Sequence, residues 1–221
     1  QRLACQVCHI PVFARDLTAP TKVEWYWEDA GQDIDPIPTD PVTGKPTYDK
    51  KKGSFAWANN VRPKLLWFNG MYEKALINAN DTFPDPGPAV LAMPVGDYTD
   101  AESMIYPFKE MTGNQPADAD DDQILVPHLF GGAGGPNAYW GNYDWHLALQ
   151  DADLVTDQGY SGDYYFKDTV MYLSVNHEVA PKEQAWGMDG NCGDCHLDDQ
   201  IDWPALGWTD DPAEGGTRPI P

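Results

Sequence analysis

The chain has 221 residues, of which 35 are Asp or Glu and 14 are Lys or Arg, so its formal net charge is −21 at pH 7. This acidity excludes proteins that bind nucleic acid or anionic lipid through a basic surface, and no apolar run reaches the roughly 20 residues that a membrane-spanning helix needs. Gly and Pro occur 20 times each and the apolar fraction is 42%, which predicts short elements joined by many turns.

A Cys-x-x-Cys-His motif lies close to the first residue, at positions 5–9, and the same pattern returns at positions 192–196. In this pattern two thiols form thioether bonds to the vinyl groups of one haem, and the adjacent histidine binds the iron from the same side. The two copies use all four cysteines of the chain, so we predict two haem c groups. The expected attachment cysteines are Cys5, Cys8, Cys192 and Cys195, and the expected proximal ligands are His9 and His196.

Three other uses of the cysteine pairs compete with haem. A thioredoxin-like redox site needs a βαβ context, which neither motif has. A shared structural zinc usually closes a much shorter loop and does not require a histidine after both pairs. Two disulfides would suit an oxidising compartment. Thioether attachment of haem takes place outside the cytoplasm in prokaryotes, so we expect a secreted protein, with its leader removed, in the periplasm or at the cell exterior.

The segments between the two motifs carry few signals of regular structure. We expect a short strand at 22–27, and a hairpin at 64–76 because Asn69-Gly70 separates two apolar and aromatic runs. Four prolines between 81 and 98 predict an exposed connection. Residues 144–153 are the best helix candidate, with Asp144 as the N-cap.

Residues 117–122 read Ala-Asp-Ala-Asp-Asp-Asp, a dense run of carboxylates. Oxygen ligands of this kind could bind Ca²⁺, but the run lacks the glycine and the terminal Glu of an EF-hand loop. A solvated acidic turn is the alternative that the pattern favours.

Three histidines remain as distal ligands for two irons: His128, His146 and His177. A histidine in this position closes the iron to substrate and suits electron transfer, whereas a vacant position permits substrate binding. Methionine is the rival ligand, and Met188 lies shortly before the second motif. Because two of the three histidines suffice, the spare one could reach a haem of a neighbouring subunit.

The sequence resembles the C-terminal part of the octahaem tetrathionate-reductase-type multihaem cytochromes c, reduced to two haems. The resemblance runs from Cys5 to about Trp208. Its most specific stretch, 171–185, leads into the second motif, and there the resemblance implies that His177 is an axial haem ligand. The other resembling stretches are 51–55, 67–70, 105–109 and 139–145.

The departures from that family shape the expected function. The family has eight haem motifs and this chain has two, so the part that would hold the substrate-binding haem is expected to be missing. His128 and His146 fall where the family does not usually have histidine, so they resemble replacements for ligands that the missing part supplies. We therefore predict that the chain is an electron-transfer protein and not an enzyme.

The expected architecture is one domain over residues 1–221, mostly irregular and organised by its cofactors, with short α-helices and one or two small β-hairpins. The expected function is electron transfer through two low-spin bis-histidine haems, with cytochromes or extracellular acceptors as redox partners. A homo-oligomer or filament with haems stacked across subunits would be a sharper form of it. The alternatives are a small haem enzyme, such as a reductase of sulfur or nitrogen oxyanions or a peroxidase, with one open iron position, and a structural or calcium-binding protein.

Overall fold

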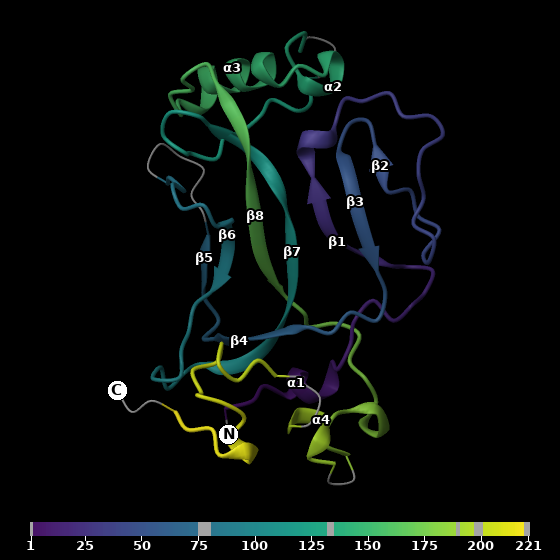
Figure 1. Ribbon diagram of the computed structural model, residues 1–221, viewed down its shortest axis with the longest axis vertical. Helices are drawn as coiled ribbons and strands as arrows, with labels where there is room; N and C mark the ends of the chain where they lie inside the picture. Colours follow the sequence, from purple (N-terminus) through teal and green to yellow (C-terminus); the bar gives the residue numbers. More distant parts are fainter. Residues whose placement is uncertain (1, 75–80, 132–134, 189–190, 197–200, 219–221) are drawn as a thin grey trace.

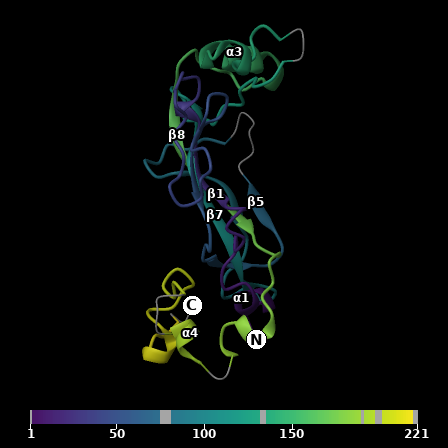
Figure 2. The same ribbon diagram turned by 90° about the vertical axis from the view of Figure 1, so that its right-hand side faces the viewer.

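Two long antiparallel strands form the spine of the molecule: β7 (Met104–Asp118) and β8 (Tyr164–Ser174). The computed structural model describes residues 2–74, 81–131, 135–188, 191–196 and 201–218. Figure 1 shows the two strands running along the longest axis, with helices at one end and both chain termini at the other. The molecule is thin when it is turned by 90° (Figure 2), and its two ends lie far apart along the longest axis in both views.

The described residues form an eight-stranded mixed sheet around this spine. Its path is β2-β3-β1-β7-β8-β6-β5, and β4 pairs with β7 outside that path. β1 is parallel to β7, β6 is parallel to β8, and the other pairs are antiparallel. The further strands are β1 (Thr21–Tyr26), β2 (Tyr48–Asp49), β3 (Gly53–Ala58), β4 (Lys64–Phe68), β5 (Tyr72–Lys74) and β6 (Ala89–Pro94).

A glycine allows β1 to approach the spine closely. Gly113 of β7 pairs with Trp25 of β1. A Cβ atom at this position would lie 1.9 Å from the Trp25 carbonyl oxygen, so any other residue would push the two strands apart.

The prediction of short α-helices is confirmed, but the expectation of one or two small hairpins is wrong, because the strands join one extended sheet. The predicted hairpin at Asn69-Gly70 is also wrong: both flanking strands exist, but β4 pairs with β7 and β5 pairs with β6. The last residues of that predicted hairpin lie outside the described residues. Residues 89–94, expected within an exposed connection, form a strand whose first residue, Ala89, is 1% exposed. Propensity rules read neighbouring residues, whereas these pairings depend on residues far along the chain.

The end opposite the termini, which we call the far end, is built from helices packed on an aromatic core. It contains α2 (Tyr139–Asn142) and α3 (Trp145–Thr156). Tyr139 stacks on Trp145 with ring centroids 3.9 Å apart, and Ala148 is buried beside them. The helix expected at 144–153 is confirmed, since the Asp144 side chain accepts a hydrogen bond from the Leu147 N–H as an N-cap.

The end that carries the termini also carries both Cys-x-x-Cys-His motifs, and we call it the haem end. The motifs lie in two short helices, α1 (Cys5–His9) and α4 (Gly193–His196) (Figures 1 and 2). One hydrophobic cluster joins them to the sheet: Val7 packs with Leu65, Ile105 and Leu206, and Cys195 packs against this cluster. Three single-turn 3-10 helices complete the described helical elements, η1 (Trp27–Asp29), η2 (Lys182–Gln184) and η4 (Pro212–Glu214).

Among the residues that the structure describes, no helix is long and apolar enough to cross a membrane.

Candidate haem site

The fold brings together two motifs that lie nearly 190 residues apart in the sequence. The Trp186 N–H, six residues before Cys192, donates a hydrogen bond of 3.0 Å to the Cys8 carbonyl. Burial raises the pKa of the Cys195 thiol, and the nearby Cys8 raises it further. The two pairs of attachment cysteines are therefore neighbours at one end of the sheet.

His9 is held by the backbone of the segment that follows β8. Its Nδ1 lies 3.2 Å from the Ala180 carbonyl oxygen, and the Ala180 N–H donates to the His9 carbonyl at 2.6 Å. The carbonyl can only accept, so Nδ1 carries the proton and Nε2 presents its lone pair. This is the tautomer that an iron ligand requires.

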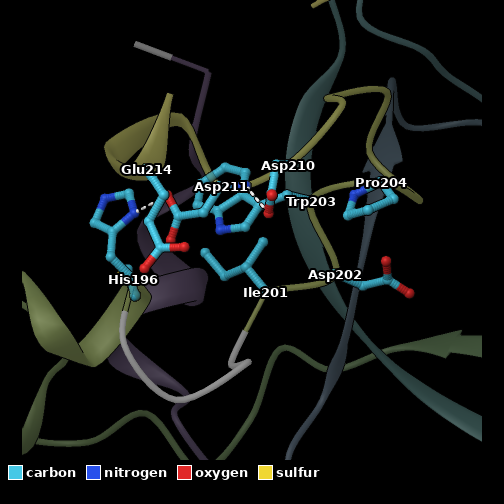
Figure 3. A pocket seen from close by; sticks show the side chains of 9 residues that line it. His196, Ile201, Asp202, Trp203, Pro204, Asp210, Asp211 and Glu214 are labelled. Atoms are coloured by element: carbon cyan, nitrogen blue, oxygen red, sulfur yellow. Dashed lines mark hydrogen bonds and ion pairs between the residues drawn. The ribbon is translucent and has the colours of Figure 1, made fainter. Parts of the chain in front are cut away.

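His196 reaches the same tautomer through side chains. Its Nδ1 lies 2.7 Å from Oδ1 of Asp211, and its ring stacks on Trp203 with centroids 5.4 Å apart and planes 6° from parallel. Figure 3 shows the His196 ring facing the Asp211 carboxylate. Burial alone would raise the pKa of Asp211, but hydrogen bonds from the Ala213 N–H and from His196 hold it below its usual value.

A cavity of about 510 Å³ opens beside Cys195 and His196. Such a volume lies within the range of about 300–1,000 Å³ that is typical of cofactor sites. Its walls combine aromatic and aliphatic side chains with several carboxylates (Figure 3). The lining residues are Cys195, His196, Ile201, Asp202, Trp203, Pro204, Asp210, Asp211 and Glu214.

These residues fit a covalently bound haem. Each motif supplies two thiols and a histidine in or directly beside one short helix, and each histidine directs Nε2 away from its hydrogen-bond partner. In the cavity at the second motif, Ile201, Trp203 and Pro204 offer apolar contacts for a porphyrin. Cys5 and Cys8 with His9 would hold one haem, and Cys192 and Cys195 with His196 would hold the other.

His177 lies in the segment that joins β8 to the haem end, three residues before the Ala180 that holds His9. The segment is anchored by Glu178, whose carboxylate accepts hydrogen bonds from the N–H groups of Ala14 and Arg15 at 3.0 and 2.9 Å. Glu178 has a φ of +60°, an uncommon value for a residue other than glycine. The imidazole of His177 is largely exposed, with 68% of its side-chain surface accessible.

The structure places His128 and His146 at the far end. The backbone N–H of His128 donates a hydrogen bond to the Ala148 carbonyl in α3. Both of its ring nitrogens also have protein partners: Asp151 at 2.6 Å and the Phe130 carbonyl at 3.1 Å. His146 lies in the first turn of α3, exposed, with Nδ1 2.9 Å from the Tyr160 hydroxyl. The distal candidates are thus divided, with His177 at the haem end and the other two at the opposite end.

The acidic run at 117–122 forms the turn after β7. Asp118 accepts hydrogen bonds from the N–H groups of Ser161 and Asp120, and Asp122 accepts one from the Tyr165 hydroxyl. Within the described ranges, no group of three or more His, Cys, Asp or Glu side chains could hold a metal ion. The structure thus gives the suggested Ca²⁺ site no support.

Comparison with known proteins agrees with this geometry. The family model described as cytochrome c bacterial matches residues 22–199. Among solved structures, the octahaem cytochrome c from Shewanella oneidensis matches with a TM-score of 0.83 and 40% sequence identity. The match covers 96% of this chain and 47% of the other, so the chain spans about half the length of that protein. No curated protein matches.

The structural match confirms the resemblance to octahaem cytochromes c and corrects one prediction drawn from it. The expectation that the chain is not an enzyme is wrong. That expectation rested on the reduced number of haem motifs. However, 96% of the chain aligns with an octahaem cytochrome c, and the resemblance relates that type of protein to reductases. Loss of motifs elsewhere is therefore no argument against a role in catalysis.

Sequence reasoning missed the residues that hold the two proximal histidines. Asp211, Trp203 and the Ala180 carbonyl have no motif spacing, and a backbone carbonyl leaves no trace in a sequence. The Ile201–Asp211 segment does carry a usable signal, since Trp203 and Asp211 follow the second motif within 15 residues of His196. Metal-bound histidines usually have such an acceptor.

Proposed function

The chain belongs to the bacterial cytochrome c family, and we propose that it carries electrons through two covalently bound c-type haems as part of a multihaem redox enzyme. The observation that carries this proposal is the meeting of the two motifs at one end of the sheet, with both proximal histidines in the ligand tautomer. A location outside the cytoplasm, in the periplasm or at the cell exterior, agrees with thioether attachment.

When bound, each haem supplies an iron that gains and loses one electron. The chain contributes the geometry. The Cys8 thiol is near enough to raise the pKa of Cys195, and Trp186 is hydrogen-bonded to the Cys8 carbonyl, so the two attachment sites would hold the haems within a short transfer distance. His9 and His196 are held by partners that prevent their rings from turning, which limits rearrangement when the charge on the iron changes.

The sixth ligands distinguish electron transfer from catalysis. Two irons need two distal groups, and His177 is the one remaining histidine at the haem end, since His128 and His146 lie at the far end. One iron of an isolated chain would therefore be closed by His177, and the other would keep an exchangeable position. An exchangeable position is what an oxyanion reductase or a peroxidase requires.

The test is haem quantification and electron paramagnetic resonance of the purified holoprotein, before and after adding cyanide or nitrite. We expect two haems for each chain, one low-spin signal that added ligand leaves unchanged, and one signal that responds. Fewer than two haems, or a failure of either haem to be reduced reversibly, would contradict the proposal. Two low-spin signals that neither cyanide nor nitrite changes would mean that protein side chains occupy the distal position of both irons.

A second candidate is a head-to-tail assembly in which the far end of one copy closes a haem of the next. The position of His146 favours it: the ring is exposed at the end opposite the motifs, and its Nδ1 is engaged by Tyr160, so Nε2 is available. A contact of this kind does not close on itself and would generate a homo-oligomer or filament with haems across subunits.

His146→Ala and His128→Ala form a matched pair for this second candidate. His128 has both ring nitrogens occupied within its own chain, so its loss should leave assembly unchanged. We expect His146→Ala to convert filaments seen by electron microscopy into single subunits and to produce a ligand-responsive haem. Compact monomers of the unaltered protein at all concentrations would exclude the assembly.

A further inference from the structure

The two proximal histidines differ in the chemistry of the group that accepts their Nδ1 proton. For His9 the acceptor is a neutral backbone carbonyl at 3.2 Å, and for His196 it is a carboxylate at 2.7 Å. Hydrogen bonds to an ionised acceptor are shorter and roughly twice as strong as those between neutral groups. The distances follow this rule, so the two histidines are not equivalent ligands.

The acceptor determines how much electron density the histidine can give to the iron. A carboxylate partner raises the basicity of a metal-bound imidazole. A more basic axial ligand stabilises the ferric state over the ferrous state, which lowers the potential of that haem. A neutral carbonyl has a weaker effect.

The other groups around His196 also favour a lower potential for its haem. The Asp211 carboxylate is almost fully buried, at 8% exposure, and Trp203 covers the face of the histidine ring. Asp202, Asp210 and Glu214 line the same cavity as Asp211. Negative charge near an iron opposes its reduction, and the partial exclusion of water strengthens that effect.

We propose that Asp211 is a positioning residue that acts through His196 to make the haem at Cys192 and Cys195 the lower-potential haem of the pair. This inference rests on the proposed function, since it requires both haems to be redox-active. Trp203 assists by stacking on the ring and holding it toward the carboxylate. Electrons would then pass downhill from the haem of the second motif to the haem of the first.

Asp211→Asn tests the proposal by removing the charge while keeping the shape. Asn is also a good N-cap, so it can preserve the hydrogen bond that Asp211 accepts from the Ala213 N–H at the start of η4. Glu214→Gln is the matched control: it removes one negative charge from the same cavity and leaves the His196 hydrogen bond in place. The readout is a spectroelectrochemical titration of each holoprotein.

In the unaltered protein we expect two one-electron waves whose equilibrium constants differ at least tenfold, which corresponds to about 59 mV. Asp211→Asn should raise the potential of the lower wave, by a tenfold or larger change in its equilibrium constant, and leave the potential of the upper wave unchanged. Glu214→Gln should move the lower wave by a smaller factor. Equal shifts in the two variants would mean that general charge, and not the His196 bond, sets the potential, and would overturn the proposal.

Two further outcomes keep the test decisive. Coincident waves in the unaltered protein would overturn the proposal without any variant, even if Asp211→Asn fails to bind haem. A chain with fewer than two haems, or without reversible reduction, would instead contradict the proposed function itself.

Discussion

The haem end and the far end of the molecule are stabilised in different ways. At the far end, Tyr139, Trp145 and Ala148 form a buried core, and both ring nitrogens of the neighbouring His128 have partners within the chain. At the haem end, α4 and the stretch that contains Asp211 together line a cavity of about 510 Å³. The far end is thus packed by its own side chains, whereas the haem end encloses a cofactor-sized cavity.

This difference indicates where the cofactor contributes to the fold. The sheet spans both ends (Figure 1), and Trp145 of α3 packs against Phe166 of β8 at the far end, so this packing does not depend on a haem. Among the described residues after His196, Ile201 and Leu206 lie in the buried cluster that contains Val7. We infer that haem attachment stabilises this segment more than any other described part of the chain.

Removal of one attachment site should have the largest effect, and it should destabilise the haem end alone. The double variant Cys192→Ser and Cys195→Ser should halve the haem content and make residues 201–218 open to limited proteolysis. The amides of α3 should keep their protection in hydrogen exchange, because their core lies at the other end of the sheet.

The matching double variant Cys5→Ser and Cys8→Ser provides the control. It also halves the haem content, but Val7 is fully buried and α1 packs directly on the sheet, so residues 201–218 should remain more resistant to protease than in the first variant. Equal loss of protection along the whole chain in both variants would show that the two ends are not independent.

A pair of leucine substitutions measures the same contrast without touching a haem ligand. Leu206 at the haem end and Leu149 in α3 are 1% and 2% exposed, so each change to alanine should cost about 3 kcal/mol of unfolding free energy in chemical denaturation. Only Leu206→Ala should alter the haem spectrum, because the Leu206 side chain belongs to the cluster against which the attachment cysteine Cys195 packs. A spectral change with Leu149→Ala would mean that strain passes along the sheet.

How much of this could be predicted from the sequence depended on the range of each interaction. The haem motifs and the α3 helix were readable, because a motif of five residues and an N-cap at Asp144 are local signals. The sheet was not, because the pairing of β4 with β7 and of β6 with β8 joins residues 36 to 80 positions apart. The pairing of His196 with Asp211 spans 15 residues across a loop, which periodicity does not reveal.

The smallest expected effect concerns acid stability at the far end. Asp118 ends β7 and is almost fully buried. Burial alone would raise the pKa of Asp118, but the N–H groups of Ser161 and Asp120 donate to its carboxylate and hold the pKa below its usual value of about 3.9. A carboxyl group with a lowered pKa in the folded state stabilises the protein above about pH 4, and this contribution is lost as the pH falls through the folded-state value.

Asp118→Asn should therefore cost about 1.5 kcal/mol of unfolding free energy at pH 7, the order expected for a hydrogen bond to a charged group. The cost should shrink as the pH falls below 4, because protonation weakens the same bonds in the unaltered protein. Denaturant titrations of both proteins between pH 2 and pH 7 measure this convergence, and the haem spectrum should not differ between them above pH 4. A cost that stays constant down to pH 2 would mean that the shape of the side chain, and not its charge, holds the turn after β7, and that the far end owes its stability to packing alone.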